Sequence, residues 1–147
     1  MKTQVAIIGG GPSGLLLSQL LHTRGIESVV LERKTKDYVL GRIRAGVLEQ
    51  GLVKLMEEAG CAERLHAEGI AHDGTLISYG NKMFRVDFLE HTGTPVMVYG
   101  QTEVTRDLYE AREACGGAME YNVEDVEIRD ATSDAPYVTF NRNGQPH

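Results

Sequence analysis

The chain has 147 residues, a net charge of −6 and a pI of about 5.3. This length suits one domain with a sizeable core. The acidic balance argues against nucleic acid and an anionic membrane surface as main partners. No apolar stretch of the sequence approaches the roughly 20 residues that cross a bilayer. The N-terminus lacks a signal-peptide pattern, and Cys61 and Cys115 lack metal-ligand spacing, so we expect reduced core thiols in a cytoplasmic protein without a metal.

The first 32 residues predict a strand, a glycine-rich turn, a helix and a second strand. Val5–Ile8 is an apolar run typical of a parallel strand buried on both faces. The run Gly9-Gly10-Gly11-Pro12-Ser13-Gly14 is a G-x-G-x-x-G turn leading into a leucine-rich helix. The second strand covers residues 28–31, and Glu32 follows it, 18 residues beyond Gly14. This arrangement is typical of a dinucleotide-binding site.

Each residue of that turn has a physical role. Gly9 permits the tight turn off the strand, Gly11 lets a pyrophosphate approach the backbone, and Gly14 lets the helix pack close to the sheet. The hydroxyl of Ser13 can donate to a phosphate beside the N–H groups of the helix start. Glu32 can accept hydrogen bonds from a ribose, which favours FAD or NAD over NADP.

Two arginines, Arg42 and Arg44, follow the second strand. The planar guanidinium grips phosphate oxygens in pairs and keeps its charge at every physiological pH. In an extended chain the two side chains point the same way, and we expect them to face the pyrophosphate. The alternative is a solvated basic loop, but its position beside the glycine turn favours ligand contact.

The remaining patterns predict a mixed α/β fold. In the first helix, we expect a core face of Leu15, Leu16, Leu17, Leu20 and Leu21 and a stop at Gly25. Further along, the patterns predict a helix over residues 47–59, a hairpin of strands 75–79 and 83–88 across Gly80-Asn81, a strand at 96–99, a helix with Thr102 as N-cap that stops at Gly116-Gly117, and strands near 118–128 and 137–141.

The C-terminal residues carry a hairpin signal. A strand pattern over residues 137–140 leads to Asn143-Gly144, a strong turn dipeptide, and only three residues follow. We expect the return strand to be missing and the chain to be a fragment of a longer protein. The alternative is a frayed natural terminus.

With these segments in place, the sequence resembles the N-terminal part of the 4-hydroxybenzoate hydroxylase family of flavoprotein aromatic hydroxylases. The resemblance runs along the whole chain and is weak between about residues 60 and 95. The most diagnostic blocks surround Gly41 and Gln101. The segments that carry the resemblance are residues 5–17, 31–33, 37–51, 99–108 and 110–116.

The resemblance implies an α/β, Rossmann-like βαβ FAD-binding fold with an added antiparallel hairpin and meander. Residues 1–147 would form the N-terminal part of one FAD-binding domain, and residues 70–100 would lean on an absent substrate domain. The glycine turn with Ser13 would face the FAD pyrophosphate, and Glu32 would hold the adenosine ribose. The implied contacts on the flavin side are Arg42, Ile43, Arg44, Ala45, Gly46 and Val47, with Arg44 reaching phosphate. Gln101 would also contact the FAD, and Arg33 and Tyr38 would help to bind transient NADPH.

The implied reaction is NADPH-dependent hydroxylation of 4-hydroxybenzoate to 3,4-dihydroxybenzoate by O2, through a flavin hydroperoxide. The family's catalytic residues lie in later segments, so no catalytic residue is predicted in this chain. A homodimer is compatible with the resemblance. Three alternatives stay open: a related flavin hydroxylase for another aromatic acid, a nucleotide-binding fragment that is inert by itself, and a plain NAD dehydrogenase.

Overall fold

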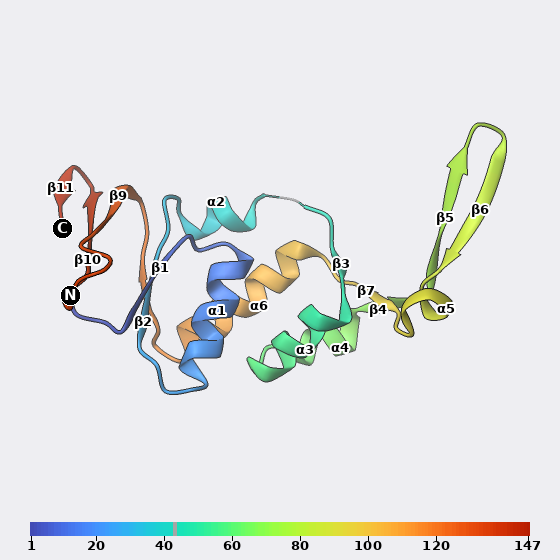
Figure 1. Ribbon diagram of the computed structural model, residues 1–147, viewed down its shortest axis with the longest axis horizontal. Helices are drawn as coiled ribbons and strands as arrows, with labels where there is room; N and C mark the ends of the chain where they lie inside the picture. The colour runs from blue at the N-terminus through green and yellow to red at the C-terminus, as the bar shows by residue number, and fades with distance from the viewer. Residues whose placement is uncertain (43) are drawn as a thin grey trace.

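A three-stranded parallel sheet forms the centre of the computed structural model, which describes residues 1–42 and 44–147. Its strand order is β1 (Val5–Ile8), β2 (Ser28–Leu31) and β8 (Ala118–Glu120). Helices α1 (Pro12–His22) and α6 (Gln101–Ala114) cover one face of this sheet (Figure 1). The predicted βαβ unit is confirmed, and both of its strands have the predicted bounds.

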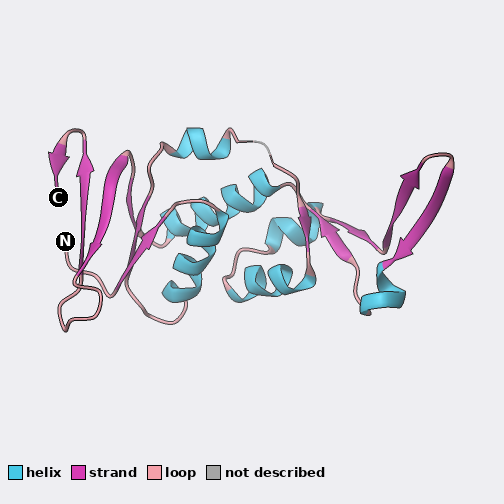
Figure 2. Cartoon of the chain, turned by 45° about the horizontal axis from the view of Figure 1, so that its top comes forward, coloured by secondary structure: helices cyan, strands magenta, loops and turns pink. Residues whose placement is uncertain are grey.

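A second, antiparallel sheet covers the other face of β2. It contains β9 (Val123–Arg129), β10 (Tyr137–Arg142) and β11 (Gln145–Pro146) in the order β11, β10, β9. Leu31 of β2 packs against Val123 of β9 in a small apolar cluster. Every residue of β2 is therefore buried, because layers lie on both of its faces (Figure 2).

The prediction that β1 is buried on both faces is wrong. Only Ile7 of this strand is buried, and Ile8 is 53% exposed. The physical reason is position, because β1 is an edge strand of its sheet and the second sheet covers its neighbour β2. Ile7 faces the helix side, where its Cγ2 atom lies close to Gly14.

A small antiparallel sheet lies beyond the helices. Its strands are β3 (Val47–Leu48), β7 (Val96–Val98) and β4 (Ile70–His72), with β7 in the middle. Helices α3 (Gln50–Glu58) and α4 (Glu63–Glu68) lie between β3 and β4 in the chain. This sheet connects the arginine-containing segment to the strand that precedes α6.

The predicted helix over residues 47–59 is wrong at its start. Val47 and Leu48 pair with β7 instead, and α3 begins only after Glu49, whose backbone is extended. An apolar residue at position 48 is compatible with the buried face of a helix and also with a buried strand. The long-range pairing with β7 decides between the two. The helix ends close to the predicted residue 59, just before Gly60, which adopts a positive φ of 71°.

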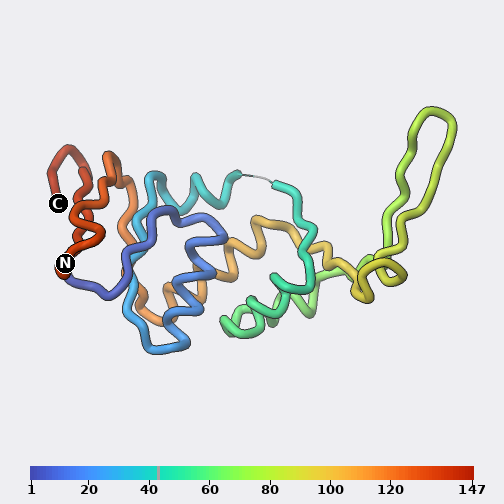
Figure 3. Tube along the Cα trace, in the orientation of Figure 1, coloured from blue at the N-terminus to red at the C-terminus, as the bar shows by residue number. Residues whose placement is uncertain are grey.

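A long hairpin projects from the body of the molecule. Its strands are β5 (Gly74–Tyr79) and β6 (Lys82–Asp87), and the short helix α5 (Phe88–Thr92) follows. This hairpin and its turn at Gly80-Asn81 confirm the prediction. The yellow-green segment extends far from the rest of the chain in Figures 1 and 3.

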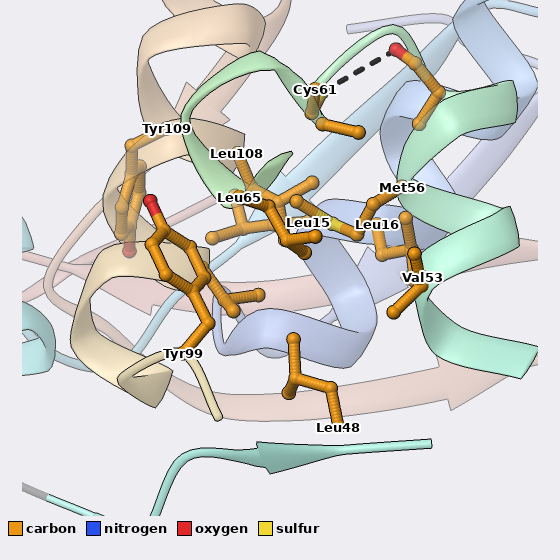
Figure 4. Packing of buried hydrophobic residues seen from close by; sticks show 13 residues of the cluster. Leu15, Leu16, Leu48, Val53, Met56, Cys61, Leu65, Tyr99, Leu108 and Tyr109 are labelled. Carbon is orange, nitrogen blue, oxygen red and sulfur yellow. Dashed lines mark hydrogen bonds between the residues drawn. The ribbon is translucent and has the colours of Figure 1, made fainter. Parts of the chain in front are cut away.

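The main core lies among α1, α3, α4 and α6 (Figure 4). Leu15, Met56, Leu65 and Leu108 are fully buried there. Leu17 is 47% exposed, so its predicted place on the core face is wrong. Successive helical residues are separated by about 100° around the axis, and therefore three consecutive leucines cannot share one face.

The predictions about the start of α6 and about the strand after β10 are also wrong. Gly100, rather than Thr102, is the N-cap of α6, and Thr102 lies inside the helix. The return strand after β10 is present as the two residues of β11. Asn143 and Gly144 both have positive φ, which fits the two-residue turn that joins twisted antiparallel strands.

Both cysteines are free thiols. Cys61 is buried in the main core, and burial raises the pKa of its thiol to about 11. Cys115 is half-buried at the end of α6. Two free thiols agree with the expectation of reduced cysteines, and Cys61 is the one that lies fully within the core.

Candidate dinucleotide site

The glycine turn has the geometry that close strand–helix packing requires. Gly9 has a φ of 112°, a conformation that favours glycine. A Cβ atom on Gly14 would collide with the carbonyl oxygen of Gly9. A Cβ atom on Gly11 would meet nothing within 4 Å, so open space lies beside this part of the backbone.

Ser13 lies in the first turn of α1 and is exposed. Gly11 is the N-cap of this helix, and no side chain caps it. Pro12 occupies the first helical position, where a missing N–H costs least. The free N–H groups and the positive end of the helix dipole therefore face the open side of the turn, as an anion site needs.

Glu32 connects the end of β2 to the glycine turn. One carboxylate oxygen, Oε2, accepts a hydrogen bond of 2.7 Å from the Gly10 N–H. The other, Oε1, accepts one of 2.8 Å from the Lys34 N–H. Each carboxylate oxygen can accept two hydrogen bonds, so Glu32 keeps acceptor capacity for a further donor such as a ribose hydroxyl.

Tyr109 is a residue of this site that the sequence did not reveal. It lies on α6 and is fully buried, and its hydroxyl donates a hydrogen bond of 2.9 Å to the Gly10 carbonyl. The only available signal was a polar aromatic residue within a predicted helix. Nothing local in the sequence distinguishes that residue from an ordinary core aromatic.

A shallow pocket of about 410 Å³ lies beside the carboxyl ends of β1 and β2. It brings together three predicted site residues, Gly9, Glu32 and Arg33. Residues 123–126 of β9 also line the pocket and were not predicted as site residues. The pocket lies at the carboxyl ends of parallel strands, which is the edge where open α/β sheets generally bind ligands.

Exposed cations surround Tyr38 on the short helix α2 (Lys36–Leu40). The Lys34 ammonium lies 5.5 Å from the centre of the Tyr38 ring, and the Arg42 guanidinium lies 5.9 Å from it. The Arg42 Nη1 also lies 3.5 Å from the Tyr38 hydroxyl. Tyr38 and Arg42, predicted for different ligands, are therefore neighbours.

The second part of the arginine segment splits into exposed and packed residues. Arg44 and Ala45 are exposed, and Ile43 lies outside the described residues. Gly46 accepts a backbone hydrogen bond of 2.9 Å from the Tyr99 N–H, and a Cβ atom there would collide with the Tyr99 carbonyl. Gly46 thus allows a close approach of two backbones, next to Val47 in β3.

A charged network holds the beginning of α6, where Gln101 is the first helical residue. Arg64 of α4 donates to Asp107 at 2.6 Å and to Glu103 at 2.7 Å. The buried Tyr99 hydroxyl donates to the other Asp107 oxygen at 2.7 Å. The nearby Arg64 holds the pKa of Glu103 below its usual value, and burial together with the Asp107 hydrogen bond raises the pKa of Tyr99.

The structure joins most of the predicted site residues into two groups, whereas Arg42, Arg44 and Ala45 are exposed and lie outside both. The first contains the glycine turn, Glu32 and Arg33, joined at the end of the parallel sheet. The second contains Gly46, Val47 and Gln101, joined through β3, β7 and Tyr99. Within residues 1–42 and 44–147, no hydrogen bond or ion pair links the two groups directly.

Fold and glycine turn together define a dinucleotide-binding domain. A model of the family described as FAD binding domain matches residues 2–147, and the chain belongs to this family. The chain is also 52% identical to p-hydroxybenzoate hydroxylase of Acinetobacter baylyi (strain ATCC 33305 / BD413 / ADP1) over 145 residues. That match covers 98% of this chain and 36% of the relative, so the chain spans little more than a third of its length.

Solved structures share the fold. BexE, studied for oxidation during BE-7585A biosynthesis, superposes with a TM-score of 0.80 at 25% identity over 100% of this chain and 29% of that chain. The p-nitrophenol 4-monooxygenase of Pseudomonas putida DLL-E4 superposes with a TM-score of 0.76 at 21% identity over 97% of this chain and 37% of that chain. The predicted Rossmann-like FAD-binding fold is confirmed.

Across residues 1–42 and 44–147, none of the helices combines the length and apolar character that crossing a membrane requires.

Proposed function

We propose that this chain is the FAD-binding portion of an NADPH-dependent flavin monooxygenase that converts 4-hydroxybenzoate into 3,4-dihydroxybenzoate. The observation that carries the proposal is the 52% identity to p-hydroxybenzoate hydroxylase along 98% of the chain. Because the match covers 36% of that enzyme, we further propose that the chain belongs to a longer protein.

The turn fits the cofactor. Open space beside Gly11 leaves room for a pyrophosphate, with Ser13 and the N-terminus of α1 as donors. Glu32, which already fixes the Gly10 N–H, would accept from the adenosine ribose. When bound, FAD supplies the redox and oxygen chemistry, whereas the protein supplies binding and orientation.

The second group, together with the arginine segment before it, would hold the flavin side of the cofactor. We assign this role to the segment from Arg42 to Val47 and to Gln101. Gly46 itself lies directly against the strand end that precedes α6. Arg44 is exposed and carries a charge suited to a phosphate oxygen.

The surface around Tyr38 would receive NADPH. Residues 33–44 contain five of the 15 Lys and Arg residues of the chain and one acid, although the whole chain carries −6. A local positive surface attracts a phosphorylated cosubstrate even when the net charge is negative. Arg33 and Tyr38 are the proposed contacts, and Lys34 and Arg42 flank the Tyr38 ring.

The aromatic substrate would contact other parts of the full-length protein. We propose that residues 70–100, which include the projecting hairpin, lean on a further domain that helps to bind it. The exposed apolar side chains of the hairpin support this arrangement, because such surface in a folded protein usually has a partner. We name no catalytic residue in this chain.

The test uses the full-length protein. We expect the purified protein to be yellow, to release FAD on denaturation, and to consume NADPH and O2 while forming 3,4-dihydroxybenzoate from 4-hydroxybenzoate. Chromatography with mass spectrometry identifies both the cofactor and the product. A protein that releases FAD but hydroxylates only another aromatic acid would support the related-hydroxylase alternative. A colourless protein that transfers hydride to NAD would contradict the proposal.

A further inference from the structure

Gly10 of the glycine turn is held from both sides. Its N–H donates to Glu32 at 2.7 Å, and its carbonyl accepts from the Tyr109 hydroxyl at 2.9 Å. Tyr109 comes from α6, 99 residues further along the chain, and no part of it reaches solvent. Along residues 1–42 and 44–147, no other donor reaches this carbonyl.

We propose that Tyr109 is a positioning residue for the FAD pyrophosphate, acting through the peptide group between Gly10 and Gly11. This inference rests on the proposed function. In a trans peptide the carbonyl and the N–H of one unit point in opposite directions. Fixing the Gly10 carbonyl toward α6 therefore directs the Gly11 N–H away from α6. Among the described residues this N–H has no backbone acceptor, and a Cβ atom on Gly11 would meet nothing within 4 Å, so the backbone here is accessible to a ligand oxygen.

The direction of the hydrogen bond is fixed by chemistry. A carbonyl oxygen only accepts, so the phenol must donate and must be protonated. Burial raises the pKa of Tyr109 well above its usual value, with smaller contributions from Tyr121, Glu32 and Glu113. The Lys36 ammonium lies 5.4 Å from the Tyr109 ring and binds Glu113 at 2.7 Å. The donor is thus present throughout the physiological range.

Removing the hydroxyl would leave the carbonyl of buried Gly10 without a partner. Glu32 cannot replace it, because an ionised carboxylate only accepts hydrogen bonds. The Gly10–Gly11 peptide would then be free to rotate, which two consecutive glycines permit. An N–H without a fixed direction binds a phosphate oxygen less well, because the peptide group then loses conformational entropy when the ligand binds.

The experiment compares the full-length protein with its Tyr109→Phe variant. Phenylalanine keeps the ring and removes only the donor. We expect the dissociation constant of FAD, measured by flavin fluorescence on titrating the apoprotein, to rise about 5- to 30-fold. We also expect the ³¹P chemical shifts of the bound pyrophosphate to move. The matched control is Tyr121→Phe, because the half-buried Tyr121 lies 6.4 Å from Tyr109 and its hydroxyl lies near Met119.

Three outcomes are distinguishable. A Tyr109→Phe protein with a lower apoprotein melting temperature but unchanged FAD affinity and ³¹P shifts would overturn the inference, because Tyr109 would then be structural only. If Tyr109→Phe fails to fold, site-specific Tyr109→3-fluorotyrosine keeps the hydroxyl and makes it a stronger donor, so the ³¹P shifts must move while FAD binding must not weaken, and unchanged ³¹P shifts would overturn the inference. Failure of the unmodified protein to bind FAD would instead contradict the proposed function.

Discussion

At the scale of single residues, Gly14 determines how closely α1 approaches β1. A Cβ atom there would collide with the Gly9 carbonyl and lie 3.2 Å from Ile7 Cγ2. We expect Gly14→Ala to lower the free energy of unfolding of the full-length protein by about 1–3 kcal/mol, as overpacking does. Urea denaturation measures this. Gly51→Ala is the control, because a Cβ atom on this residue of α3 meets nothing within 4 Å. Alanine in place of a helical glycine should raise the free energy of unfolding by about 0.5–1 kcal/mol. Equal effects of both substitutions would contradict the packing argument.

Arg44 carries the proposed phosphate contact of the arginine segment. We expect Arg44→Ser to weaken FAD retention by the full-length protein about tenfold, because one charge-assisted contact is lost. The flavin content after gel filtration measures retention. Arg24→Ser is the control, since Arg24 is more than half exposed and pairs with exposed Glu58. Unchanged flavin content in the Arg44 variant would exclude its phosphate role.

At the scale of elements, Arg64 links α4 to the beginning of α6. We expect Arg64→Met to destabilise the full-length protein by about 1–3 kcal/mol, because buried Asp107 loses its charged partner. The pKa of Glu103 lies below its usual 4.5 owing to Arg64. A carboxyl with a lowered pKa stabilises the fold above its usual pKa and loses this contribution as the pH falls below it.

The difference between the Arg64→Met variant and the unmodified protein should therefore be largest near pH 7 and shrink below about pH 4.5. Unfolding by urea at pH 7, 5, 4 and 3 measures the profile. Arg24→Met is the control for an exposed ion pair and should cost less than about 1 kcal/mol at every pH. A difference independent of pH would show that the Glu103 contact contributes nothing.

The projecting hairpin exposes apolar side chains on both faces. Ile77 pairs with Phe84 on one face, and they are 41% and 53% exposed. Leu76 and Met83 lie on the other face, and they are 61% and 67% exposed. We expect the double variant Ile77→Thr/Phe84→Thr to aggregate less than the unmodified 147-residue chain, measured by light scattering, and to lower the melting temperature of the full-length protein.

This pair of opposite effects tests whether the rest of the full-length chain covers the hairpin. Lys82→Thr, near the tip of the same hairpin, should change neither quantity. An unchanged melting temperature in the full-length double variant would mean that no other part of that protein covers this face.

At the scale of the whole molecule, the 147-residue chain has an unpaired strand edge and an exposed apolar hairpin. The edge strand β1 and the hairpin β5–β6 both expose groups that a larger fold would cover. We expect the isolated chain to bind FAD weakly and to oxidise no NADPH when FAD is added, because the catalytic groups are proposed to lie elsewhere. Absorbance at 340 nm follows the reaction. Steady NADPH oxidation would contradict this, and the full-length protein assayed in parallel is the positive control.

The sequence by itself determined the parts of the protein that local rules govern. The glycine turn, both strands of the βαβ unit, the hairpin at Gly80-Asn81 and the place of Glu32 follow from hydrophobic period and turn chemistry over a few residues. These features need no distant partner to be recognised. The family resemblance, now confirmed, depended on contiguous blocks of the same kind.

Only the tertiary structure decided the parts that distant residues share. Val47 and Leu48 form a strand because β7, some 50 residues away, offers them backbone partners. The Gly10 carbonyl meets Tyr109 across 99 residues, and Arg64 meets Asp107 across 43. Such contacts leave no local signature, because each residue is an ordinary choice for its own helix. They exist only once packing has set the distance between the elements.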